Sequence, residues 1–335
     1  MVEAVSASGE LVETSSILQV LRKLRRPRAI VIVPTRHLVS QITKTAKDLA
    51  HHCKLRVLGI HGRSKNVADS LMTPVDLLVV TPDMLHKLMK QGKVSVANTS
   101  KVVMDEADTL FDSNYELEVQ PLVKDILKIR ASQSKSVSFV FVTATFPKSL
   151  DRKLTTEFGE IERITTPSLH RTPSGLRQRF VKLNSSTTKE NLIMEVIKSV
   201  CTETNRMLVF VNRLQTAEEV VDLLKSKNID VVSISSRLHP EEQTKFLKAF
   251  TDTVSNKEFM VCVATDMASR GLDFKQVGHV LLYDFPQTTI DYIHRVGRAA
   301  RFGRRGQATS FVTRKDVELA TRIEKSLKSS KELHQ

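Results

Sequence analysis

Short apolar runs rich in β-branched residues alternate, in the first half of the chain, with longer segments of mixed polarity. The runs lie at residues 29–33, 56–60, 77–80, 101–104 and 137–142. In the first longer segment, apolar residues recur at helical spacing, at Leu38, Ile42, Ala46 and Leu49. Strand-length apolar runs separated by amphipathic helices are typical of βαβ units. The pattern therefore predicts an α/β fold built on a parallel sheet.

The alternation stops near residue 165 and then resumes. The segment 165–175 combines prolines, serines and a glycine without any period, which is typical of a linker. Strand-like runs follow at residues 180–183, 207–211, 231–234, 261–264 and 279–283, and a helical pattern covers 316–327. Thr216 and Glu219 have the spacing of a capping box, which predicts a helix start there. We predict a first domain at 1–165, a linker at 166–178, a second domain at 179–318, and a C-terminal helix or tail at 319–335.

Charge is the most informative feature of the composition. The 335 residues carry a formal net charge of +14, while the 41% hydrophobic content is that of an ordinary globular protein. A protein this basic usually meets a polyanion, and nucleic acid is the first candidate, although basic residues also simply solvate surfaces. Cys53, Cys201 and Cys262 lie far apart, which argues against a zinc site or a disulfide framework and suits a reducing compartment.

No apolar run is long enough to span a membrane, so we expect no membrane partner. The first residues carry Glu3, Glu10 and Glu13 and lack an apolar core, so they resemble neither a secretory signal nor a transit peptide. We expect any targeting segment to lie upstream of Met1.

An acidic stretch follows the apolar residues Val102, Val103 and Met104. Asp105, Glu106 and Asp108 stand where this run stops. Ligands of open α/β sheets bind outside the carboxyl ends of the strands, so acids placed there are positioned for chemistry. One carboxylate on Mg²⁺ beside another that polarises water suits phosphate hydrolysis. The alternative is a solvated acidic turn.

The acidic stretch is one of seven short motifs that occur in order. They are Pro34-Thr35-Arg36, Thr81-Pro82-Asp83, Asp105-Glu106-Ala107-Asp108, Thr143-Ala144-Thr145, Phe210-Val211-Asn212, residues 264–273 and residues 294–301. This ordered set resembles the DEAD-box RNA helicases over nearly the whole chain. The resemblance implies two tandem RecA-like parallel-sheet domains joined by a flexible linker, an ATP-dependent RNA helicase activity, and ATP and Mg²⁺ as cofactors.

The resemblance also implies catalytic roles. Asp105 would hold Mg²⁺ and Glu106 would orient and deprotonate the attacking water. Arg298 and Arg301 match the family's arginine fingers, which stabilise charge on the γ-phosphate. The alternative for this pair is a solvated basic turn that binds phosphate backbone.

Further residues match the family's nucleotide-sensing positions: Gly9, Asp108, Thr143, Thr145, Asp273 and His294. Asp108, Thr143 and Thr145 would link ATP state to domain closure, and Asp273 would contact the ribose or the fingers. His294 and Arg295 would tie their motif to the acids, and Gly297 would permit a tight turn. Strand-end capping is the alternative for the threonines and aspartates.

The resemblance assigns RNA contacts to loops that hold the backbone without reading bases. The residues are Pro34, Thr35, Arg36, Gly62, Thr81, Pro82, Asp83, Thr265, Asp266 and Arg270. The chain has no Trp and three Tyr, so extensive base stacking is not expected. We expect a monomer that binds RNA with little sequence specificity and strong salt dependence, with ribosomal or ribonucleoprotein assembly factors as further partners.

The phosphate-binding loop departs from the family pattern. Gly9 fits, but Glu10 replaces the lysine and Leu11 replaces the magnesium-binding hydroxyl. At about 4 Å and an effective dielectric near 20, one charge pair is worth about 4 kcal/mol. Replacing a lysine that attracts the ATP phosphate by a glutamate that repels it would therefore weaken ATP binding by several kcal/mol. The family's adenine-reading segment is absent before this loop. Either the protein has lost normal ATP handling, or Met1 begins a shortened chain; the otherwise complete motifs favour the second.

Two stretches, residues 143–147 and 165–170, are similar to mitochondrial DEAD-box helicases that act in large-ribosomal-subunit assembly. This similarity predicts a mitochondrial matrix location, with the nucleus, nucleolus or cytoplasm as alternatives. The functional hypothesis is an RNA-dependent ATPase that remodels RNA duplexes or ribonucleoproteins. Its alternatives are an ATPase-silent RNA clamp or scaffold and a DNA-directed translocase.

Overall fold

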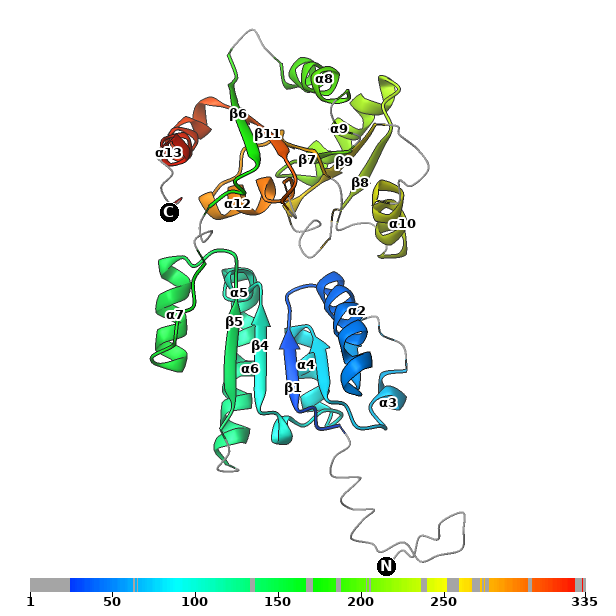
Figure 1. Cartoon of the computed structure of the whole chain (residues 1–335), viewed down its shortest axis with the longest axis vertical. Helices are drawn as coiled ribbons and strands as arrows, with labels where there is room; N and C mark the ends of the chain where they lie inside the picture. Colours follow the sequence, from blue (N-terminus) through cyan, green and yellow to red (C-terminus); the bar gives the residue numbers. More distant parts are fainter. Residues whose placement is uncertain are drawn as a thin grey trace, which may run out of the picture. The chain divides into compact units, whose positions relative to one another are not determined.

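A computed structural model describes two compact units, residues 1–161 and residues 162–335. The residues that the structure describes are 25–62, 64, 66–132, 136–166, 171–184, 188–202, 204, 206–235, 240–251, 259–266, 272, 274, 277–300, 303–328 and 333. Each unit is a parallel sheet with helices, and the two are described separately (Figure 1).

The first unit contains a five-stranded sheet in the order β2-β3-β1-β4-β5, with every pair parallel. Its elements are β1 (Ala29–Ile32), α2 (Arg36–Cys53), β2 (Val57–Ile60), α3 (Val67–Ser70), β3 (Leu77–Val80), α4 (Pro82–Lys90), a 3-10 turn (Val96–Asn98), β4 (Lys101–Asp105), α5 (Ala107–Leu110), α6 (Ser113–Ala131), β5 (Ser138–Val142) and α7 (Lys148–Phe158). Because all strands run the same way, their carboxyl ends share one edge.

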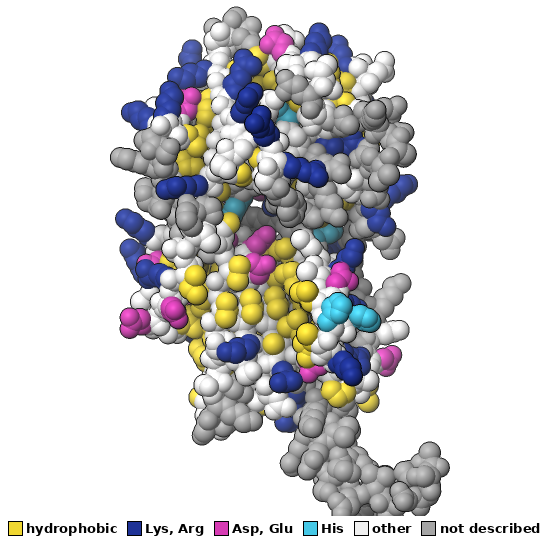
Figure 2. Space-filling view, viewed as in Figure 1, with side chains coloured by type: hydrophobic (Ala, Val, Ile, Leu, Met, Phe, Trp, Pro, Cys, Tyr) yellow, Lys and Arg dark blue, Asp and Glu magenta, His cyan; other side chains and the backbone are white. Residues whose placement is uncertain are grey.

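The two faces of this sheet are covered unequally. One face packs against α4, α6 and α7 in a large apolar core that includes Leu85, Leu122 and Leu150. On the other face, a smaller core joins α2 to β1 and β3. Over β5 that face is open, since Val140 is 44% and Val142 is 46% exposed. Figure 2 shows hydrophobic side chains gathered over these strands.

The second unit contains a six-stranded parallel sheet in the order β6-β11-β10-β7-β9-β8. Its elements are β6 (Leu176–Lys182), α8 (Lys189–Val200), β7 (Arg206–Phe210), α9 (Leu214–Ser226), β8 (Val231–Ile234), α10 (Pro240–Thr251), β9 (Met260–Ala264), β10 (His279–Leu282), α12 (Thr289–Val296), β11 (Gly306–Val312), a 3-10 turn (Arg314–Asp316) and α13 (Val317–Lys328). Its central strands are buried on both faces, between two large apolar cores.

Three local predictions need correction. β6 begins at Leu176, inside the expected linker, because it pairs with all seven residues of β11. α9 begins at Leu214 and not at the expected capping box, so Thr216 lies within the helix and the Glu219 carboxylate accepts a bond from Gln215 at 3.2 Å. The predicted C-terminal helix is present as α13, but it contributes Ala320 and Ile323 to the core, so the second unit extends past the expected boundary at residue 318.

The five predicted strands of each half are present. Among the described residues, no helix combines the length and the apolar character needed to cross a bilayer.

Candidate active site

The acidic loop at the carboxyl end of β4 is the first part of the candidate site. Val102 and Met104 anchor this strand in the core, and Asp105 is its last residue. The Glu106 backbone N–H donates to Asp105 Oδ1 at 2.9 Å. Glu106 is the N-cap of α5 at φ 52°, in the left-handed region that costs a non-glycine residue about 1–2 kcal/mol. The chain thus turns sharply between the two acids.

Electrostatics distinguish Asp105 from an ordinary surface carboxylate. Burial raises its pKa, the Glu106 N–H opposes the rise, and the negative charge of Asp108 adds to it. Within the described part of the chain, no salt bridge neutralises Asp105. A cation bound at this carboxylate would offset both raising causes.

Asp108 is joined to the loop after β5. The Thr145 hydroxyl donates to Asp108 Oδ2, while the Thr109 N–H donates to Asp108 Oδ1 at 3.0 Å. Thr145 is fully buried, and its carbonyl accepts a 2.7 Å bond from the Thr143 hydroxyl. The structure therefore brings Asp108, Thr143 and Thr145 together, as the family resemblance implied. Their role in sensing ATP stays a prediction.

The first-unit residues predicted to contact RNA lie along the same edge of the sheet. Thr35 and Arg36 follow β1, Gly62 follows β2, and Thr81 follows β3. The Thr35 hydroxyl caps α2 by accepting from the Leu38 N–H at 3.3 Å, whereas Thr81 caps α4 without a side-chain bond. Gly62 is exposed, and a Cβ there would meet no atom within 4 Å. The Thr35 side chain thus caps a helix in this structure. Packing around position 62 does not require glycine there.

Pro34, Pro82 and Asp83 complete this edge of the first sheet. Pro34 is buried between β1 and α2. Pro82 occupies the first turn of α4 and is buried, which suits a residue without a backbone N–H. Asp83 is exposed in the same turn, where the helix dipole favours a negative charge.

In the second unit, Arg295 organises the corresponding edge. Its side chain is 3% exposed and forms a two-point ion pair with Asp266, at 2.7 and 2.5 Å. The same guanidinium donates to the Asp284 carbonyl at 2.8 Å and to Asn212 Oδ1 at 2.6 Å, and lies over the Phe210 ring. Arg295 was expected to tie its motif to the acids of the first unit; here its carboxylate partner is Asp266 of its own unit.

This network includes residues that sequence reasoning missed. The Asp284 carboxylate pairs with Lys189 at 2.5 Å and accepts from the Asn212 N–H at 2.9 Å. Asp284 shortly follows β10, as Asp266 shortly follows β9, so its strand-end position was the available signal. Thr265 precedes Asp266 and is half-buried. Since the Asp266 carboxylate is engaged by Arg295, any RNA contact by Asp266 stays a prediction.

The motif after α12 shows two backbone features that differ from expectation. Gly297 has φ −65°, so it needs no left-handed freedom; a Cβ there would lie 2.8 Å from the Ile293 carbonyl oxygen. Ala300, two residues after Arg298, has φ 56°. His294 is half-buried in the last turn of α12, and Arg298 donates to the Leu272 carbonyl at 2.8 Å. The close approach of the Ile293 carbonyl explains the glycine at position 297, and Ala300 is the residue with a strained backbone.

Several predicted site residues lie outside the described residues. They are Gly9, Arg270, Asp273 and Arg301, together with the substituted Glu10 and Leu11 of the phosphate-binding loop.

Among the described residues, Asp105 is suited to bind Mg²⁺, but those residues offer no complete set of protein ligands for it. Asp105 supplies a hard oxygen ligand whose charge is uncompensated, which suits this cation. Within the described ranges, no group of three or more His, Cys, Asp or Glu side chains could hold a metal. A Mg²⁺ ion here would therefore depend mainly on phosphate oxygens and water, as is usual at nucleotide sites.

Comparison with known sequences agrees with this arrangement. The profile described as "DEAD/DEAH box helicase" matches residues 11–152, and the profile described as "Helicase conserved C-terminal domain" matches residues 188–303. The chain belongs to the DEAD-box helicase family.

Two relatives illustrate the degree of similarity. This helicase chain is 34% identical over 315 residues to "DEAD-box ATP-dependent RNA helicase 39" of Arabidopsis thaliana, covering 93% of this chain and 50% of that protein. It is 30% identical over 343 residues to "ATP-dependent RNA helicase mrh4, mitochondrial" of Neurospora crassa, covering 87% and 54%. The chain thus spans about half the length of the curated relatives it matches.

Solved structures confirm the predicted fold class. S. cerevisiae Dbp5 bound to RNA and ADP BeF3 matches with a TM-score of 0.72 at 22% identity, covering 96% of this chain and 81% of that one. Mss116p bound to ssRNA and AMP-PNP matches with a TM-score of 0.73 at 18% identity, covering 93% and 64%. The two units are tandem RecA-like domains.

Proposed function

We propose that this chain carries the catalytic frame of an RNA-dependent ATPase that remodels RNA duplexes or ribonucleoproteins. The observation that carries the proposal is the acidic loop, where a half-buried Asp105 without a salt bridge among the described residues stands beside Glu106, and Asp108 bonds to Thr145. In this proposal Asp105 holds Mg²⁺, which would neutralise charge on the phosphates. Glu106 orients water and accepts its proton, and Arg298 and Arg301 stabilise the developing negative charge.

RNA binding in this proposal uses the loops at the carboxyl ends of the strands. Thr35, Arg36, Thr81 and Thr265 offer hydroxyl, guanidinium and backbone N–H groups there. Such groups hold phosphates and 2′-OH groups without reading bases.

ATP turnover measured with and without single-stranded RNA tests the proposal. We expect RNA to stimulate turnover, and Glu106→Gln to lower it by about 10²–10⁴-fold, since general-base catalysis contributes that factor. Glu118→Gln, on α6, is a matched control that removes an exposed carboxylate. Turnover that ignores RNA would refute the proposal, and equal stimulation by DNA of the same sequence would favour a DNA translocase.

The substituted phosphate-binding loop favours a second candidate, an ATP-silent RNA clamp or scaffold. The carboxylate of Glu10 would repel the phosphates of ATP, and Leu11 lacks the hydroxyl that would bind the metal ion. This candidate predicts that RNA affinity does not change on adding ATP. It also predicts that Glu10→Lys combined with Leu11→Thr is needed for any nucleotide response.

We also propose that the natural protein acts in mitochondria, in ribosome assembly. The support is that several fungal relatives carry "mitochondrial" in their names and that two short stretches resemble that subgroup. Fractionation of cells that express the natural protein, with sedimentation against ribosomal subunits, tests this. Exclusive recovery in the cytosol would refute it.

A further inference from the structure

The edge strand of the second sheet has one apolar face and one basic face. Phe180 of β6 stacks on Tyr292 with ring centroids 5.9 Å apart, and Gln178 accepts a 2.6 Å bond from the Tyr292 hydroxyl. Side chains alternate along a strand, so Arg177 and Arg179 project from the opposite face, where both are exposed. Figure 2 shows Lys and Arg side chains in a row over β6.

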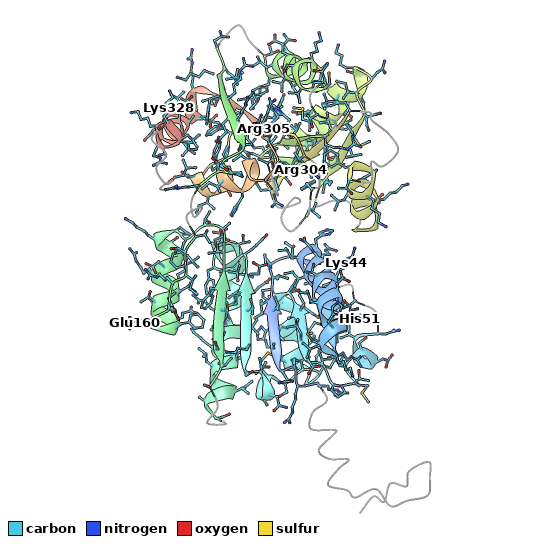
Figure 3. All side chains as sticks on the ribbon, viewed as in Figure 1. Lys44, His51, Glu160, Arg304, Arg305 and Lys328 are labelled. Carbon is cyan, nitrogen blue, oxygen red and sulfur yellow. The ribbon has the colours of Figure 1, made fainter. Side chains whose placement is uncertain are left out.

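A third arginine lies at the start of the neighbouring strand. Arg177 pairs in register with Gln307 of β11, and Arg179 pairs with Thr309. Arg305 directly precedes β11, whose first residue Gly306 pairs with Leu176, and it is exposed at the amino end of the same pair of strands. Figure 3 labels Arg305 and Arg304 beside β6. We call Arg177, Arg179 and Arg305 the β6 arginine cluster.

Tight backbone packing holds the two strand starts together. The Gly306 N–H donates to the Gly175 carbonyl at 3.1 Å, and a Cβ at Gly175 would lie 3.0 Å from the Arg304 carbonyl oxygen. Neighbouring strands are about 4.8 Å apart, and residues two apart on a strand are about 6.6 Å apart. The backbone positions of the three side chains are therefore fixed by the strand pairing, in a row along the amino-terminal half of β6.

The cluster is available to a ligand. Across the described ranges, the structure places no hydrogen bond or ion pair on these three guanidinium groups. The buried Arg295 is the opposite case, since its guanidinium is fully engaged inside the same unit. Three solvated guanidinium groups on one rigid sheet repel one another unless an anion lies between them.

We propose that the β6 arginine cluster is an accessory binding surface for the sugar–phosphate backbone of RNA, separate from the loops at the carboxyl ends of the strands. Arginine suits this ligand because its planar fork binds phosphate oxygens in pairs. The surface lies near the amino ends of β6 and β11, so an RNA must extend beyond those loops to reach it. The inference rests on the proposed function only in taking RNA as the polyanion.

The rival explanation is protection of a sheet edge. Natural proteins place charges on edge strands to prevent pairing with other chains. That explanation predicts aggregation when the charges are removed, with RNA affinity unchanged.

Equilibrium binding of the full chain to a fluorescent single-stranded RNA tests the proposal. The variant is Arg177→Gln, Arg179→Gln and Arg305→Gln together. The control is Lys225→Gln, Lys227→Gln and Lys248→Gln, which removes equal charge from exposed positions on α9, at its C-cap and on α10. For an RNA of about 30 nucleotides, we expect the cluster variant to bind at least fivefold more weakly. The slope of log K against log salt should fall by about 2, because each single-strand phosphate contact contributes about 0.7.

An RNA of about eight nucleotides should bind the cluster variant and the parent chain equally, because it reaches only the loops. Replacing the three arginines by lysine should retain most of the long-RNA affinity, since the charge remains. Equal weakening of the cluster and control variants would overturn the proposal, as would aggregation of the cluster variant with unchanged RNA affinity. None of these readouts uses ATP, so absent ATPase activity would count against the proposed function alone.

Discussion

Carboxylates stand at the carboxyl ends of parallel strands in both units, but their surroundings differ. In the second unit, Asp266 and Asp284 are matched by the buried Arg295 and by Lys189. In the first unit, Asp105 accepts a backbone N–H and has no salt bridge among the described residues. The same strand-end position thus holds structural acids in one sheet and an uncompensated acid in the other. An acid that the fold leaves unneutralised is the better candidate for binding a cation.

The largest expected effect comes from removing the buried guanidinium of Arg295 in the second unit. Arg295→Ala removes the ion-pair partner of Asp266 in a mostly buried site, which typically costs about 3–5 kcal/mol. Denaturant unfolding should show this loss, and Arg295→Lys should recover part of it. Arg298→Ala is the control, since its bond to the Leu272 carbonyl should contribute only about 1 kcal/mol. A loss below about 1 kcal/mol for Arg295→Ala would contradict the structural role assigned to this ion pair.

Asp105 should behave in the opposite way. Asp105→Asn should lower RNA-stimulated ATP turnover by at least about 100-fold, a typical cost of losing one charge-stabilising group. It should also raise stability at pH 7, because the raised pKa of Asp105 means that its ionised form disfavours the folded state.

The stability gain from Asp105→Asn has a defined pH window. It should shrink as pH falls through the raised pKa of the folded state and disappear below the ordinary value of 3.8, where the carboxyl is protonated in folded and unfolded chains alike. Unfolding midpoints measured from pH 7 to pH 4 check this trend. A destabilised Asp105→Asn protein at pH 7 would show that the acid is structural after all.

The amino end of the second sheet provides a further test, because a polar group there is buried without compensation. His279 is 2% exposed, neither ring nitrogen has a hydrogen-bond partner among the residues that the structure describes, and burial lowers its pKa to about 4. A depressed folded-state pKa gives full stability above the unfolded value near 6.5 and a loss as pH falls toward 4. Between pH 7 and pH 5, this site should cost about 1–2 kcal/mol, since one pKa unit is worth about 1.4 kcal/mol.

His279→Leu should reduce the loss of unfolding free energy between pH 7 and pH 5. At neutral pH its unfolding free energy should stay within about 1.5 kcal/mol of that of the parent chain. Urea titrations at several pH values provide the measurement. If His279→Leu lost as much unfolding free energy between pH 7 and pH 5 as the parent chain, other groups would be responsible for that loss.

The smallest expected effect concerns the loop after α12. Ala300→Gly should stabilise the second unit by about 0.5–1 kcal/mol, because glycine accepts φ 56° without the steric cost that alanine carries. Ala299→Gly is the matched control: this neighbour is buried and has no positive φ, so losing its Cβ should destabilise by about 1 kcal/mol. Thermal unfolding of both variants decides the matter, and the same sign for both would contradict the strain argument.

Much of the fold was predictable because it is encoded in local periods. Apolar runs and helical spacing located the five expected strands of each half, and the ordered motifs placed candidate residues at strand ends. β6 was predicted to start later than it does because its first half alternates arginine with apolar and amide residues, as an edge strand does. The start of α9 was misjudged because Arg213, which offers no side-chain cap, occupies the N-cap.

Residue order and spacing were sufficient to indicate two parallel sheets, an excess of basic charge and the acids at the end of β4, because these depend on composition and on neighbours along the chain. They could not indicate that Arg295 engages Asp266, Asn212 and the Asp284 carbonyl, since those partners lie 29, 83 and 11 residues away. Nor could they show the raised pKa of Asp105 or that Arg305 lies beside the strand that carries Arg177 and Arg179. Burial and cross-strand register exist only once distant segments pack, and those two quantities set the charge environment of every group discussed above.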